Sequence, residues 1–132
     1  MTNNDARVAI LNRIALAGLP TDLGGANIDA TVPSTSTVWI RPTIKFNTGR
    51  VESIGGARRS RSGVVIIQVF TPIDSGQGDS DDAANTLVLL FESQSDPGGL
   101  RYYNVGQRDI GRVGQWWQSS VTLDFEYDVA CV

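Results

Sequence analysis

Histidine is absent from the sequence and cysteine occurs once, as Cys131. Without an imidazole, the chain can have neither a histidine general base nor a histidine-ligated metal. One cysteine forms no intrachain disulfide and no thiolate zinc site, which fits folding in a reducing compartment. No pair of carboxylates is marked out for acid–base work. The sequence therefore predicts a protein that is not an enzyme and has no cofactor.

Long hydrophobic runs are also missing. No apolar run approaches the roughly 20 residues that span a bilayer, and the N-terminus lacks a basic leader and a cleavage pattern. Hydrophobic residues still make up 41% of the 132 residues, which is enough for a core. We expect one soluble domain over residues 1–132, made in the cytoplasm and without a membrane partner.

Periodic apolar residues predict two helices. The first follows a cap at Asn3 or Asn4 and ends at Gly18 and Pro20. The second begins at Asp79 or Ser80, where acidic residues favour the positive end of the helix. The expected buried stripes are Val8, Leu11, Ile14 and Ala15 in the first helix and Ala84, Leu87, Val88 and Phe91 in the second.

Four further segments read as strands, at 37–46, 63–72, roughly 100–106 and 116–129. In the last of these, Trp117 belongs to the apolar face. Residues 19–36 are an irregular connection, and residues 47–62 form a long β-hairpin arm. The order αββαββ predicts an α+β fold: a four-stranded, mostly antiparallel sheet with both helices on one face.

Glycines and aspartates form no recognisable ligand motif. Those in GQRDIGRVG and GQGDSD match neither a phosphate loop nor a dinucleotide fingerprint. The aspartates of DSGQGDSDD resemble a loose cation loop, but the predicted helix begins inside it, where a calcium loop would continue to its distal glutamate. A capped helix start is the better interpretation, and no metal site is predicted.

The stretch GGARRSRSG, residues 55–63, concentrates three arginines in an acidic chain of net charge -3. A nucleic-acid patch, a contact with an acidic surface of another subunit and a solvated turn all remain open. The single lysine and a pI of about 4.7 disfavour nucleic acid as the main partner.

Charge is segregated along the chain. Six basic residues lie between positions 41 and 61, and six acidic ones lie between 74 and 96. In a homo-oligomer, a basic loop of one subunit can meet the acidic helix start of the next, although unrelated loops can also differ in charge by chance. Adjacent aromatic residues are weak pointers to an interface as well. The candidate residues for a subunit interface or a lumen are Arg50, Arg58, Arg59, Arg61, Asp79, Asp81, Asp82, Tyr102 and Trp116.

Four segments resemble the tail terminator, or tail completion, proteins of long-tailed bacteriophages. They are ARVAILNRIAL, VWIRPTIKF, GVVIIQVFTPIDSGQGDSDDAANTL and WWQSSVTLDFEYD. The resemblance implies a hexameric ring that ends the tail tube and meets the head–tail connector, in a virion assembled in the host cytoplasm. It implies action by shape and self-association, with DNA only passing through the lumen. Another tail or neck ring, such as a head completion or tail tube protein, and a nucleic-acid-binding module are the alternatives.

Overall fold

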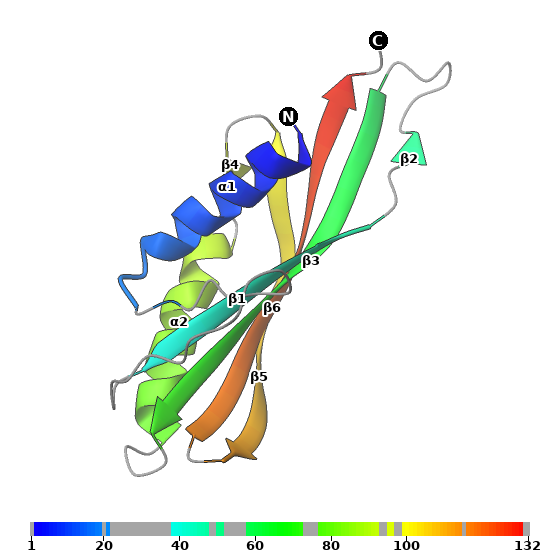
Figure 1. Ribbon diagram of the computed structural model, residues 1–132. Coiled ribbons are helices and arrows are strands. Elements are labelled where there is room, and N and C mark those ends of the chain that lie inside the picture. Colours follow the sequence, from blue (N-terminus) through cyan, green and yellow to red (C-terminus); the bar gives the residue numbers. More distant parts are fainter. Residues whose placement is uncertain are drawn as a thin grey trace.

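The computed structural model describes residues 2–19, 21, 38–47, 50–51, 58–72, 77–92, 95–96, 99–114 and 116–130. Within these residues, two helices and four long strands follow one another in the predicted α+β order (Figure 1). Two further strands of two residues each lie between them, one before the second long strand and one before the third. The elements are α1 (Asn3–Ala15), β1 (Trp39–Phe46), β2 (Arg50–Val51), β3 (Arg58–Pro72), α2 (Gln77–Phe91), β4 (Ser95–Asp96), β5 (Leu100–Val113) and β6 (Trp116–Ala130).

All named strands lie in one antiparallel sheet. Its order is β1-β3-β6-β5-β4, and β2 also pairs with β3. The two central strands pair along their whole length, from Arg58 opposite Ala130 to Pro72 opposite Trp116. The predicted four-stranded antiparallel sheet is thus confirmed, and long-range pairing of β3 with β6 forms its centre.

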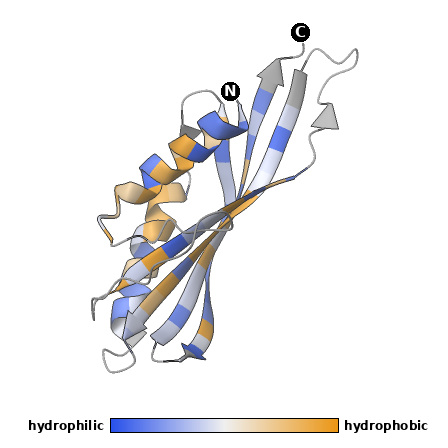
Figure 2. Cartoon of the chain, viewed as in Figure 1, coloured by the Kyte–Doolittle hydropathy of each residue, from blue (hydrophilic) through white to orange (hydrophobic). Residues whose placement is uncertain are grey.

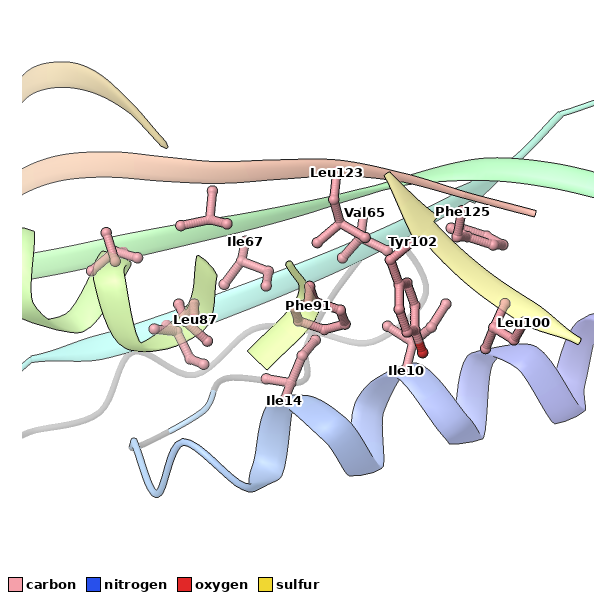
Figure 3. Packing of buried hydrophobic residues seen from close by; sticks show 14 of the residues in the cluster. Ile10, Ile14, Val65, Ile67, Leu87, Phe91, Leu100, Tyr102, Leu123 and Phe125 are labelled. Atoms are coloured by element: carbon pink, nitrogen blue, oxygen red, sulfur yellow. The ribbon is translucent and has the colours of Figure 1, made fainter. Parts of the chain in front are cut away.

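The core lies between this sheet and both helices. Alternate residues of β1, β3 and β6 share one face, and this face joins residues of both helices in a single buried cluster. Figure 3 shows Ile10 and Ile14 of α1 pointing toward Phe91 of α2 and the strands. Hydrophobic residues lie along the middle of the sheet and on both helices, and hydrophilic residues lie toward both ends of the sheet (Figure 2).

Helix α1 is rotated relative to the predicted stripe. Ile14 is buried as predicted, together with Ala6 and Ile10, whereas Val8 is 47% exposed and Ala15 is also exposed. The buried residues are spaced by four, so they lie in one row along the helix. The apolar stripe was broad enough to allow several rotations, and packing on the sheet selects one of them. The cap is also different, because Thr2 and not Asn3 or Asn4 precedes the helix.

A reciprocal capping box begins α1. The Thr2 N–H donates to Asp5 Oδ2 at 2.9 Å, and the Asp5 N–H donates to Thr2 Oγ1 at 3.1 Å. Hydrogen bonds from the backbone and then from the side chain of Thr2 lower the pKa of Asp5 below its ordinary value of 3.8. The ionised carboxylate is therefore the form that favours the folded helix start.

We expect the first turn of α1 to loosen in acid. Because the folded pKa of Asp5 is depressed, its contribution is complete above the unfolded pKa near 3.8 and is lost as pH falls through the folded pKa. An NMR titration of the Asp5 carboxyl, with amide shifts of the first turn, measures this. Asp5→Asn should abolish the pH dependence of those amide shifts. A midpoint at or above 3.8 would contradict the assignment.

Two strands are longer than the sequence indicated. Strand β5 continues to Val113 through two register irregularities, between Tyr103 and Gly106 and between Asp109 and Gly111. These irregularities break the period-two alternation, which is why a prediction based on it ends at Gly106. Strand β3 begins at Arg58 and not at residue 63. The last six residues of GGARRSRSG, 58–63, are therefore part of the sheet.

Helix α2 begins at Gln77, before the predicted start at Asp79 or Ser80. Ser80 is buried, and its hydroxyl oxygen lies 2.8 Å from that of Ser119 on β6. This hydrogen bond ties the first turn of the helix to the sheet. The predicted irregular connection at 19–36 lies outside the described residues except for Leu19 and Thr21.

Candidate functional site

Of the hairpin predicted over residues 47–62, residues 48–49 and 52–57 lie outside the described part of the chain. The described part extends the sheet, and we call β2 together with residues 58–62 of β3 the arm. Arg50 pairs with Ser60 and Val51 pairs with Arg59. On its other side the same stretch of β3 pairs with β6, where Arg61 lies opposite Tyr127. The arginine cluster therefore lies on backbone that pairs with β6 throughout and also with β2 at Arg59 and Ser60, and Ser60 is buried.

The arm joins the sheet at Gly63. A Cβ atom at this position would lie 2.2 Å from the carbonyl oxygen of Lys45 and 2.6 Å from the ring of Phe125. Phe125 packs edge-to-face against Phe46, with ring centroids 5.5 Å apart. The Asn47 N–H then donates to the Ser62 carbonyl at 2.7 Å. The base of the arm is thus closely packed backbone and aromatic rings.

The candidate acidic residues lie at the other end of the sheet. Asp79, Asp81 and Asp82 are exposed in the first turns of α2, and Gln107 Nε2 donates to Asp81 Oδ1 at 3.0 Å. Helix α2 follows Pro72 at the end of β3, while the arm contains the start of β3 (Figure 1).

Within one chain, the arginines of the arm and the aspartates at the start of α2 are too far apart to touch. Arg61 and Pro72 are 11 residues apart in the same strand. At about 3.3 Å per residue, this spacing corresponds to roughly 36 Å. The arm and the start of α2 consequently cannot form ion pairs with each other inside one molecule.

Tyr102 is a core residue, contrary to its expected place at an interface. It is 7% exposed, its ring packs edge-to-face on Phe91 at 4.9 Å, and the Arg13 guanidinium lies 5.6 Å from the ring centroid. Its neighbour Tyr103 is 41% exposed and lies on the opposite face of the sheet. Adjacent residues of a strand point to opposite faces, so only one of the pair can be buried by the helices.

Trp116 is half-buried on the face opposite the helices. Its ring packs edge-to-face against Trp39, with centroids 5.8 Å apart, and Trp39 stacks on Phe70 at 4.2 Å. Arg41 lies 5.3 Å from the centroid of the Trp39 ring. Trp116 thus belongs to an aromatic cluster within the chain. Trp117, expected in the apolar face, lies on the helix side and is also half-buried.

Sequence reasoning missed one ionic cluster. Arg101 Nη2 lies 2.6 Å from Glu126 Oε1 and 3.3 Å from Asp128 Oδ1. The hydrogen bond to Glu126, and to a smaller extent the one to Asp128, raises the pKa of Arg101, which stays cationic. The partners are 25 and 27 residues apart, so only the register of β5 against β6 brings them together.

Neither a metal centre nor a membrane span emerges from the part of the chain that the structure describes. There, no three histidine, cysteine, aspartate or glutamate side chains gather closely enough to hold an ion. Likewise, neither described helix is long and apolar enough to cross a bilayer. The charged arm and the acidic helix start remain the candidate functional surfaces.

Comparison with known proteins adds two findings. Residues 4–125 match the model of a family described as phage tail terminator protein. One solved structure shares the fold with a TM-score of 0.75 and 19% sequence identity, covering 100% of this chain and 99% of that chain. No curated protein matches the sequence significantly.

Proposed function

This chain belongs to the phage tail terminator family, and from this membership we propose that it forms a ring, of six subunits, that ends the tail tube. The family gives it a structural role in the phage tail, in contact with other tail proteins. The finer proposal is that the ring stops tube polymerisation and offers a surface to the head connector. DNA would pass through its lumen without being a bound ligand.

The proposal for how subunits meet depends on one observation: a cluster of arginines lies at one end of the sheet, and a cluster of aspartates lies at the other. The arm contains Arg50, Arg58 and Arg59, and the start of α2 carries exposed Asp79, Asp81 and Asp82. A contact of the arm with the next subunit's helix start is heterologous, since two different surfaces meet. Repeating such a contact closes a ring when the rotation between subunits allows it.

Charge complementarity supports orientation more than affinity in such a contact. Opposite charges brought together at the surface select one arrangement and disfavour arm–arm or helix–helix contacts. The attraction is screened over about 8 Å at physiological ionic strength. Assembly of the purified protein should therefore weaken as salt is raised.

A charge exchange tests the proposal. Variant A carries Arg58→Glu and Arg59→Glu, and variant B carries Asp79→Arg, Asp81→Arg and Asp82→Arg. Substitution is preferable to deletion, because residues 58–62 pair with β6 and removing them would cut into the central strand. Each variant alone should assemble at least tenfold more weakly than the wild type, because like charges then meet at every contact.

An equimolar mixture of the two variants should assemble again, with A and B alternating around the ring. Sedimentation velocity and electron microscopy at micromolar concentration measure this, and Arg108→Glu, at an exposed position on β5, is the control. The proposed contact would be overturned if each variant alone assembled as tightly as the wild type, or if the mixture did not assemble. Tight duplex-DNA binding that variant A alone loses would favour a nucleic-acid module.

A further inference from the structure

The hydroxyl of Tyr127 has a hydrogen-bond partner on helix α1. Tyr127 is fully buried on β6, opposite Arg61 of the arm. A buried phenol hydroxyl needs a hydrogen-bond partner. Asn3, the first residue of α1, provides it: the Tyr127 hydroxyl donates to Asn3 Oδ1. One polar side chain of the helix thus satisfies a buried group 124 residues away.

The same oxygen also faces the arm. Arg61 Nη1 donates to Asn3 Oδ1 over a long 3.5 Å, from the neighbouring strand. One turn further along α1, the Arg7 guanidinium lies 5.1 Å from the ring centroid of Phe46, at the end of β1. The first two turns of the helix therefore contact one residue on each of the three strands at the base of the arm: Phe46 on β1, Arg61 on β3 and Tyr127 on β6.

We infer that the start of α1 is a brace that holds the arm in its direction, with Asn3 and Arg7 as positioning residues for assembly. This inference rests on the proposed function, in which the arm contacts the next subunit. Residues 58–62 are held by β6, but β2 adds only two paired residues at the edge of the arm, and so short an edge strand has little stability of its own. A brace that orders the arm before contact lowers the entropy lost on association.

The brace changes the role of Arg61 among the candidate arginines. Its side chain is half-buried and bonded within its own chain, so it acts on a neighbour through the position of the arm. In this inference Arg61 acts through the position of the arm, in place of the direct interface contact expected from the sequence. Arg58 and Arg59, nearer the start of β3, remain the proposed contact residues.

Substitution of Asn3 tests the brace. Asn3→Leu removes the acceptor for Tyr127 and Arg61, whereas Asn3→Asp keeps an oxygen acceptor and places an anion where a helix start favours it. Asn4→Leu, at the exposed neighbouring position, is the matched control. Hydrogen exchange of the Ser60–Ser62 amides in dilute monomer, and the dissociation constant for assembly, are measured for each.

Asn3→Leu should speed exchange in the arm roughly tenfold and weaken assembly by a similar factor, with the Ile67 amide in the sheet centre unchanged. Asn3→Asp and Asn4→Leu should behave like the wild type. Tyr127→Phe removes only the hydroxyl that donates to Asn3 and should have the same effect as Asn3→Leu. It therefore tests the brace even if Asn3→Leu does not fold.

The brace is wrong if exchange in the arm is the same in Asn3→Leu and the wild type, or if Asn3→Asp fails to restore protection. It is also wrong if arm exchange rises while assembly of the variant stays as tight as wild type. Failure of the wild-type protein to assemble would instead overturn the proposed function, because the exchange measurement on monomer does not depend on the ring.

Discussion

Alanine at Gly63 should destabilise the fold by about 3 kcal/mol, at the upper end of the cost of overpacking. The added Cβ would lie 2.2 Å from the Lys45 carbonyl oxygen, which belongs to the paired backbone of β1. It would also lie 2.6 Å from the Phe125 ring, which is held between the sheet and Phe46. Neither neighbour can move without breaking the pairing or the core.

Urea unfolding of Gly63→Ala and Gly106→Ala measures the effect. Gly106 lies in the same sheet, on β5, and a Cβ there meets nothing within 4 Å. Gly106→Ala should therefore unfold near the wild-type midpoint. Equal midpoints for the two variants would show that the base of the arm is looser than the structure indicates.

Phe91→Ala is expected to cost about 3–5 kcal/mol, which is typical for deleting a fully buried phenyl ring. Phe91 closes α2 and is fully buried in the cluster between the helices and the sheet (Figure 3). Its ring also packs edge-to-face on Tyr102 at 4.9 Å. Truncation removes this contact and leaves a cavity between two helices and β5.

The matched control is Leu89→Ala, two residues earlier in the same helix. Leu89 is 62% exposed, so its truncation should change the free energy of unfolding by no more than about 0.5 kcal/mol. Chemical denaturation of both variants at the same low protein concentration compares them. A large loss for Leu89→Ala, or a small one for Phe91→Ala, would mean that α2 is rotated relative to the sheet.

Family membership supports the role of the protein in the phage, whereas the two charged clusters support a proposal for how its subunits contact one another. The family establishes a structural role in the phage tail. In the proposed ring, the arm of one copy contacts the acidic start of α2 of the next copy, and these two surfaces lie at opposite ends of β3. A subunit with two unlike ends has the polarity that a closed ring of heterologous contacts requires.

Local patterns in the sequence were sufficient for the order of the elements. Alternation in residues 63–72 and 116–129 predicted strands, and the spacing of Ala84, Leu87 and Phe91 predicted both the second helix and its buried side. The separate basic and acidic blocks were visible as well. These features depend on residues within a few positions of one another, so periodicity and composition carry them.

Only the tertiary structure decided the features that depend on pairing. The rotation of α1, the burial of Tyr102 in place of Tyr103, and the inclusion of Arg58–Ser62 in β3 all follow from which strand or helix lies alongside. So do the bond from Tyr127 to Asn3 and the close approach at Gly63. Period-two and period-3.6 patterns define the faces of an element, but its partner and register are set by contacts between residues far apart in the chain.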